Sequence, residues 1–205
     1  IAQISGIRNI QQITDWLYKS LGEHLSHQAD RRVSVGVFHP SSLGSQCDRY
    51  LWMHYNGKLV SQKVDARLRS IFDQGFVTQN KYAKYFRDMG ILHDEEAAVK
   101  FPNPVISGRA DFILRIPSFN NALYVTDIKT INENGFKKLV GPKEEHVVQV
   151  QVYMNILGIN VGGLLYENKN TQEINWFHLQ KDGQLFANII SRCKHIMEMK
   201  EAPEI

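Results

Sequence analysis

The chain has 205 residues, of which 43% are hydrophobic and 22% are charged, and its formal net charge is +3. This length and composition suit one globular domain with an added helical segment, and they exclude a repeat or low-complexity protein. The sequence contains no run of about 18 apolar residues and no signal-peptide pattern, so we expect a soluble cytoplasmic protein without a membrane partner. The small positive charge is compatible with nucleic-acid binding but does not require it.

The first residues predict a helical extension that we place at residues 1–36, before a main domain at 37–205. Apolar side chains recur at helical spacing within residues 7–25: Ile10, Ile13, Trp16, Leu17, Leu21 and Leu25. Packing is the simpler interpretation of this stripe, and binding of a partner is the alternative. The polar segment 28–36 is interpreted as a loop.

A second helix is predicted from Ser41 or Ser42, either of which could cap it, to about Tyr55, where Asn56-Gly57 ends it. A long third helix is predicted from Leu68 to Met89, and Gly90 follows as its stop signal. The two cysteines, at positions 47 and 193, lie far apart and are interpreted as free thiols rather than a disulfide.

Three strands are predicted next, at residues 97–101, 105–116 and 122–129, because apolar and polar residues alternate there. The acidic run at residues 94–96 is interpreted as a solvated turn before the first of them. Residues 132–143 form a polar segment that contains Lys137 and Lys138. It is interpreted either as a loop that tracks nucleic-acid phosphates or as a plain solvated loop.

The remaining elements are a helix at residues 144–157, two strands at 161–167 and 171–178, and a final helix at 183–200 that we expect to pack against the sheet. Gln149 and Tyr153 are four residues apart, so they share one face of the first of these helices.

Three charged residues of the predicted strands indicate a hydrolytic site. Asp127 and Lys129 are two residues apart and therefore point to the same face of their strand. A hairpin through residues 117–121 would bring Asp111 beside Asp127. Oxygen ligands of this kind suit Mg²⁺, and the lysine would orient or deprotonate an attacking water. The pattern therefore predicts hydrolysis of a phosphodiester bond.

Three motifs occur in the same order as in a known group of nucleases: Gly108-Arg109-Ala110-Asp111, Asp127-Ile128-Lys129, and Gln149 followed four residues later by Tyr153. The region from about residue 38 to 180 resembles the PD-(D/E)xK nuclease superfamily, and in particular its RecB-like exonuclease branch. The resemblance implies an α/β fold with a restriction-endonuclease-like core, a central mixed sheet flanked by helices, and helical additions at both ends. It also implies a bacterial protein, or one acting in a phage-infected host.

The resemblance further implies the roles of the site residues. Asp111, Asp127 and the backbone carbonyl of Ile128 would hold one or two Mg²⁺ or Mn²⁺ ions, and Lys129 would act on the nucleophile. Gln149 would hold substrate or water, with Tyr153 in support. Many relatives carry a histidine ligand four residues after a helix glycine. Here that position is Gln79, which could act only as a weak ligand, for example through water.

In iron–sulfur members of the group, the cysteine corresponding to Cys47 is one of four cluster ligands. This chain offers only Cys193 near its C-terminus, so we expect no iron–sulfur cluster and interpret Cys47 as a buried structural cysteine. Arg49 is expected either to contact a DNA phosphate or to form a surface ion pair. Arg109 could brace a metal-ligating carboxylate or meet a phosphate, and Lys169 could contact DNA or be an exposed hairpin lysine.

The sequence thus predicts a metal-dependent deoxyribonuclease, specifically an exonuclease of DNA recombination, repair or replication. Its expected partners are single- or double-stranded DNA ends and a recombination or single-strand-binding protein. Two alternatives stay open: a subunit that binds DNA without cutting it, favoured by the departure at Gln79, and a structure- or sequence-specific endonuclease.

Overall fold

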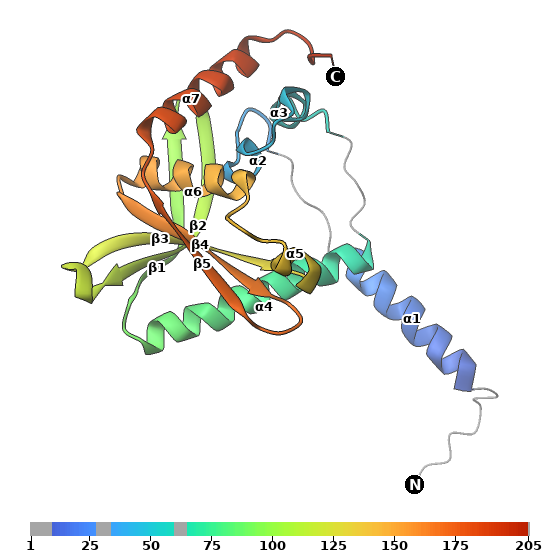
Figure 1. Cartoon of the computed structure of the whole chain (residues 1–205). Helices are drawn as coiled ribbons and strands as arrows, with labels where there is room; N and C mark the ends of the chain where they lie inside the picture. The colour runs from blue at the N-terminus through green and yellow to red at the C-terminus, as the bar shows by residue number, and fades with distance from the viewer. Residues whose placement is uncertain (1–9, 28–33, 60–64, 205) are drawn as a thin grey trace. The chain divides into compact units, whose positions relative to one another are not determined.

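The computed structural model describes residues 10–27, 34–59 and 65–204 (Figure 1). Its elements follow in the order α1 (Ile10–His27), α2 (Pro40–Leu43), α3 (Asp48–Tyr55), α4 (Ala66–Asp88), β1 (Leu92–Pro102), β2 (Val105–Ile116), η1 (Pro117–Phe119), β3 (Ala122–Ile131), α5 (Glu133–Lys137), α6 (Glu144–Leu157), β4 (Val161–Asn168), β5 (Ile174–Gln180) and α7 (Gly183–Glu198). The chain divides into two compact units, of which one contains α1 and the first half of α4, and the other contains the remaining elements.

The larger unit is built on a five-stranded mixed sheet with the order β1-β2-β3-β4-β5. Each pair of neighbours is antiparallel except β3 and β4, which are parallel. Parallel neighbours need a crossover connection, and α6 lies within the connection between β3 and β4. The predicted hairpin between β2 and β3 is confirmed, as is the predicted mixed sheet flanked by helices.

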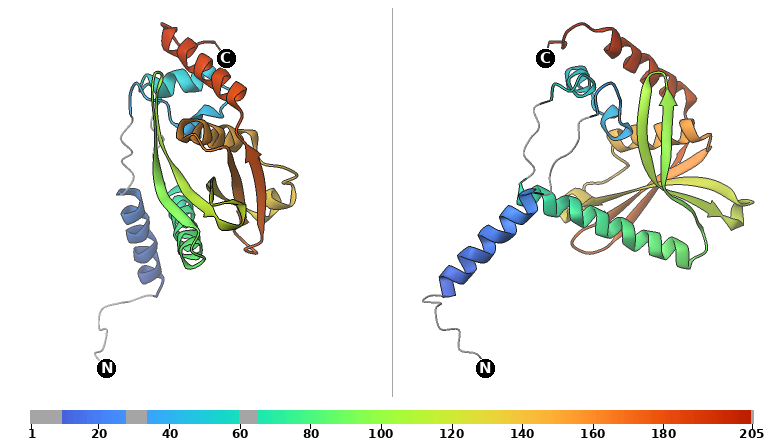
Figure 2. Two further views of the ribbon diagram at one scale, coloured as in Figure 1. Left: turned by 90° about the vertical axis from the view of Figure 1, so that its left-hand side faces the viewer. Right: turned by 180° about the vertical axis from the view of Figure 1, so that it is seen from behind.

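The two faces of the sheet are covered by different helices. Helix α6 lies on one face, where its residues Val150 and Met154 pack against Val125 of β3 and Leu164 of β4. The second half of α4 lies on the other face and packs through residues such as Tyr82 and Phe86. Figures 1 and 2 show these two layers on either side of the sheet. Because α6 is buried along much of its length, its polar residues are held in fixed positions.

Strands β2 and β3 separate part-way along the sheet. Their pairing runs from Ile116–Ala122 to Phe112–Thr126 and stops there. The earlier part of β2 continues to pair with β1, and Phe38 forms a parallel bridge with Ile106 at its start. A gap therefore opens between β2 and β3 directly beyond Phe112, and the next residue of β2 on that side is Asp111.

The segment before α4 differs from its prediction. Instead of one helix from Ser41 or Ser42, there are two short helices, α2 and α3, because the chain turns between Gly44 and Cys47. Cys47 is the N-cap of α3, and its Sγ accepts a hydrogen bond from the Tyr50 N–H at 3.4 Å. Cys47 is exposed, so the prediction that it is buried is wrong, whereas Cys193 is buried.

Two further segments differ from their predicted secondary structure. The acidic residues 94–96 belong to β1 rather than to a turn, because β1 pairs with β2 from Leu92 onward. Helix α5 forms inside the segment predicted as a loop, where Asn132 caps it through a hydrogen bond from the Gly135 N–H. Helix α7 packs against α3 and α6 in a cluster that includes Ile189 and Cys193. It also contacts the sheet, as predicted, through Phe186, whose ring lies edge-on to that of Phe101 of β1.

Helix α1 confirms the helix predicted near the N-terminus, and it exposes several large apolar side chains, among them Trp16, Leu17 and Leu21. Residues 1–9 and 28–33 of the predicted extension lie outside the described residues. Among the helices that are described, none combines the length and the apolar character needed to cross a bilayer.

Gly44 is required by the close approach of the α2–α3 turn to the start of α6. A Cβ atom at this position would overlap the backbone of Glu145. We expect Gly44→Ala to lower the free energy of unfolding by about 1–3 kcal/mol, since the overlap is with backbone that cannot rotate away. Urea unfolding measures this, and Gly141→Ala is the matched control because a Cβ there meets nothing within 4 Å. Equal stability of the two variants would contradict the packing described here.

The two thiols should differ in reactivity. Burial raises the pKa of Cys193 to about 12, so its thiol stays protonated and shielded, whereas Cys47 is exposed. Titration with an aromatic disulfide reagent is expected to detect one thiol per native chain and two per unfolded chain. Cys47→Ser, which keeps a capping oxygen at the start of α3, should leave no thiol that reacts in the native state. Two thiols reacting in the native chain would refute this assignment.

Candidate active site

The gap between β2 and β3 is bridged by a side chain. Oδ2 of Asp111 accepts a hydrogen bond from the backbone N–H of Ile128 at 2.8 Å. This N–H lies on the side of β3 that faces β2, and the separated strands leave it without a ladder partner. Asp111 takes the place of the missing carbonyl. Because the N–H and C=O of one strand residue point to the same side, the carbonyl oxygen of Ile128 faces the same gap.

Four further polar side chains form a continuous chain of contacts beside this gap. The Lys129 ammonium lies 2.8 Å from Oδ2 of Asp127 and donates to Oε1 of Gln149 at 2.9 Å. The Gln149 amide donates to Oδ1 of Asp127 at 3.1 Å and to the Tyr153 hydroxyl at 2.8 Å. The structure therefore brings together the five residues predicted as catalytic.

Two local features place the residues of α6 in this chain of contacts. Gly108 lets the start of β2 pass α2, since a Cβ there would lie 2.8 Å from the Pro40 ring. The Tyr166 hydroxyl of β4 accepts a hydrogen bond from the Lys143 N–H at 3.0 Å and is hydrogen-bonded to Nδ1 of His146 at 2.7 Å. Burial, together with the charges of Lys129 and Lys143, lowers the pKa of His146 to about 3, so the imidazole is neutral at pH 7.

The electrostatics of the site are dominated by two carboxylates in a poorly solvated place. Asp127 is 1% exposed. Desolvation raises the pKa of Asp111 well above its ordinary value, and the negative charge of Asp127 raises it further. Desolvation alone would lower the pKa of Lys129, but the charge and hydrogen bond of Asp127 and the charge of Asp111 outweigh it and raise the pKa. Lys129 therefore compensates the negative charge of Asp127 more fully than that of Asp111.

This donor set fits a hard divalent cation. Asp111, Asp127 and the Ile128 carbonyl supply oxygen atoms to one gap, and the mutual repulsion of the two carboxylates is the charge that such a cation would offset. Across the described ranges, no cluster of three or more histidine, cysteine, aspartate and glutamate side chains is arranged to hold a metal ion. The candidate site therefore depends on two carboxylates, a backbone oxygen and water, which is a coordination that Mg²⁺ accepts.

Gln79 does not join the predicted residues. Its amide donates to Oε1 of Glu96 on β1, and Arg109 forms an ion pair of 3.4 Å with Oε2 of the same carboxylate. Glu96 lies opposite Asp111, between the pairs Glu95–Phe112 and Ala97–Ala110. Its charge is among those that raise the pKa of Asp111, after desolvation and the charge of Asp127.

Glu96 is thus a residue that the sequence analysis missed when it interpreted the acidic run as a turn. A signal for it was present. The tight connection at Asn103-Pro104 pairs Pro102 with Val105, and counting back along both strands of that hairpin places residue 96 opposite residue 111. Arg109 therefore pairs with Glu96 and not with either of the carboxylates predicted to hold metal, and its predicted role stays a prediction.

The other predicted DNA-binding residues are spread over several elements. Arg49 donates to the backbone carbonyl of Pro203 at 2.9 Å and so holds the C-terminal segment against α3. Lys137 pairs with Glu133 within α5, and Lys138 is the exposed C-cap of that helix. Lys169 lies in the turn between β4 and β5, where its backbone N–H bonds to Ile131. These contacts leave the predicted DNA-binding roles of the four residues untested.

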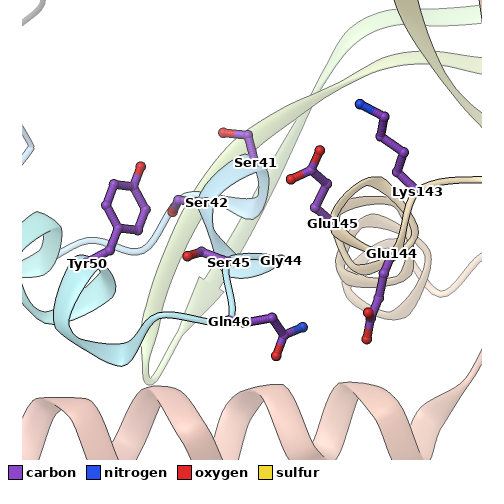
Figure 3. A pocket seen from close by; sticks show the side chains of 9 residues that line it. All are labelled: Ser41, Ser42, Gly44, Ser45, Gln46, Tyr50, Lys143, Glu144 and Glu145. Atoms are coloured by element: carbon purple, nitrogen blue, oxygen red, sulfur yellow. The ribbon is translucent and has the colours of Figure 1, made fainter. Parts of the chain in front are cut away.

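A polar hollow of about 730 Å³ lies between the α2–α3 turn and the start of α6 (Figure 3). Hydroxyl groups of Ser41, Ser45 and Tyr50 line one side, and Lys143, Glu144 and Glu145 line the other. Glu145 connects it electrostatically to the site, because its charge also contributes to the raised pKa of Lys129, after the larger effects of burial, Asp127 and Asp111.

No protein-family model and no curated protein matches the chain. Several solved structures match the chain. The protein SSO0001 shares 18% identity, with a TM-score of 0.58 over 94% of this chain and 88% of that one. The alkaline exonuclease LHK-Exo from Laribacter hongkongensis shares 13% identity, with a TM-score of 0.53 over 85% and 90%. The structure of LHK-Exo in complex with dAMP shares 14% identity, with a TM-score of 0.57 over 80% of this chain and 87% of that one. At these identities the likeness establishes the fold, which is the nuclease-like α/β fold expected from the sequence.

The two carboxylates should affect stability in opposite directions. Because the folded-state pKa of Asp111 is raised, its ionised form at neutral pH weakens the fold, and a neutral amide removes that penalty. We therefore expect Asp111→Asn, measured by urea unfolding in EDTA at pH 7, to be at least as stable as the wild-type chain. Asp127→Asn weakens the pairing of the largely buried Lys129 and should cost about 1–3 kcal/mol. The reverse order of stabilities would contradict the charge balance described above.

Proposed function

We propose that this protein is a metal-dependent deoxyribonuclease that acts as an exonuclease at DNA ends. The observation that carries the proposal is the meeting of Asp111, Asp127 and Lys129 at the gap between β2 and β3, with the Ile128 carbonyl facing the same gap. Two carboxylates and an ammonium group at one gap within the sheet are suited to hydrolysis of a phosphodiester bond, whose reaction centre is anionic.

Each residue has a role that its contacts support. Asp111 and Asp127, with the Ile128 carbonyl, would hold one or two Mg²⁺ or Mn²⁺ ions. A bound ion of this kind lowers the pKa of a coordinated water and offsets the charge that develops on the phosphate. The Lys129 ammonium donates hydrogen bonds towards the attacking oxygen and the phosphate, because it already points into the site as a donor. Gln149 keeps Asp127 and Lys129 in place, and Tyr153 orients the Gln149 amide.

The choice of DNA ends as substrate rests on the comparisons. LHK-Exo is an alkaline exonuclease, and its complex contains a deoxynucleotide. A similar substrate for this chain would place phosphates near the exposed Arg109, and Lys137, Lys138 and Lys169 could contact the strand farther away. A role in recombination, repair or replication, a recombination or single-strand-binding partner and a cytoplasmic location belong to the same proposal.

The test is digestion of end-labelled linear DNA, both single- and double-stranded, with Mg²⁺, Mn²⁺ or EDTA. We expect metal-dependent release of label and a loss of about 100-fold in rate for Lys129→Gln, which removes the ammonium but keeps an amide donor for Asp127. Lys84→Ala is the matched control, because Lys84 is an exposed residue of α4 paired with Asp88.

A closed circular plasmid separates the two cleaving alternatives, since an exonuclease leaves it intact and an endonuclease nicks it. Undiminished cleavage by Lys129→Gln would remove this site from consideration. Salt-sensitive retention of DNA in a gel shift, without cleavage under any condition, would instead identify a binding subunit that does not cut.

A further inference from the structure

Glu96 stands out among the charged residues outside the predicted catalytic set. It lies within β1 but has a φ of 54°, in the left-handed region that residues other than glycine seldom adopt. Such a conformation is unfavourable and usually persists where the surrounding structure requires it. Both carboxylate oxygens have partners, Gln79 on one side and Arg109 on the other.

These two partners fix the direction of the Glu96 side chain from different elements. Gln79 belongs to the part of α4 that covers the sheet, and Arg109 lies two residues before Asp111 on β2. The register of β1 and β2 places Glu96 across from Asp111.

The neighbouring glutamate shows that this arrangement is specific. Glu95 precedes Glu96 in β1, and its carboxylate pairs with Arg87 near the end of α4 at 2.9 Å. Glu95 lies opposite Phe112 in the register of β1 and β2, and not opposite Asp111. The two adjacent carboxylates of β1 therefore have different partners, and only Glu96 lies across from Asp111.

We infer that Glu96 is a positioning residue of the cation site at Asp111 and Asp127, acting through water from the opposite strand and held there by Gln79 and Arg109. This inference rests on the proposed function, since it concerns the same site. Glu96 adds negative charge beside Asp111 and offers an acceptor for the water that completes the coordination. Gln79 contributes by orienting Glu96 instead of approaching the cation itself.

The test measures metal binding directly, by isothermal titration of the full chain with Mn²⁺ in the absence of DNA. We expect saturable binding to the wild-type chain, loss of that binding in Asp111→Asn, and an affinity about 10-fold lower in Glu96→Gln, as for other residues that support metal ligands. Glu95→Gln is the matched control and should bind Mn²⁺ with an affinity within about twofold of the wild type, because its carboxylate is paired elsewhere.

A second variant guards against a folding defect. Glu96→Gly removes the side chain and suits the positive φ, so its unfolding midpoint in EDTA should not fall, while its Mn²⁺ affinity falls as in Glu96→Gln. Wild-type affinity in either Glu96 variant would overturn the role of Glu96 and leave the proposed function intact. Absence of saturable binding to the wild-type chain would overturn the cation site, and the role of Glu96 with it.

Discussion

The separation of β2 from β3 beyond Phe112 is the constraint on which the candidate site depends. A continuous ladder would satisfy the Ile128 N–H with a backbone carbonyl and leave no room for a ligand between the strands. Here the carboxylate of Asp111 satisfies that N–H, so the strands can diverge without leaving a buried donor unpaired. One hydrogen bond thus both preserves the sheet and allows the gap at which the candidate site lies.

The gap between the strands forms a candidate site only because α6 is fixed in position over the sheet beside it. The Tyr166 hydroxyl accepts a hydrogen bond from the Lys143 N–H at the start of α6. The α2–α3 turn also approaches the start of α6 so closely that only glycine fits at position 44. These contacts set the rotation of the helix, which then directs Gln149 towards both Asp127 and Lys129. Core packing therefore determines the geometry of the site, because the residues that fix the helix also orient the Gln149 amide.

Local periodicity was enough to predict much of this arrangement from the sequence. The bounds of β2 and α6 were predicted correctly, since alternation and helical spacing are properties of short segments. The contribution of Glu96 was missed because an acidic run looks like a solvated turn unless the hairpin register is counted through. The exposure of Cys47 could not be read from spacing, since it depends on how the short helix α3 begins. The ion pair of Glu133 and Lys137 has the i,i+4 spacing of a helix, but it was missed because the segment was interpreted as a loop.

The charge balance of the site supports the proposal that it binds a cation. Among the described residues, Lys129 pairs with Asp127 and Arg109 pairs with Glu96, whereas Asp111 has a backbone N–H as its hydrogen-bond partner. Three carboxylates therefore meet two cationic side chains, and the excess negative charge lies on the residue whose pKa is raised by burial and by Asp127. A fold selected for stability alone would neutralise Asp111 or expose it, because an imperfectly balanced buried carboxylate is costly. Keeping it ionisable between two other carboxylates has a physical rationale if a divalent cation completes the balance during function.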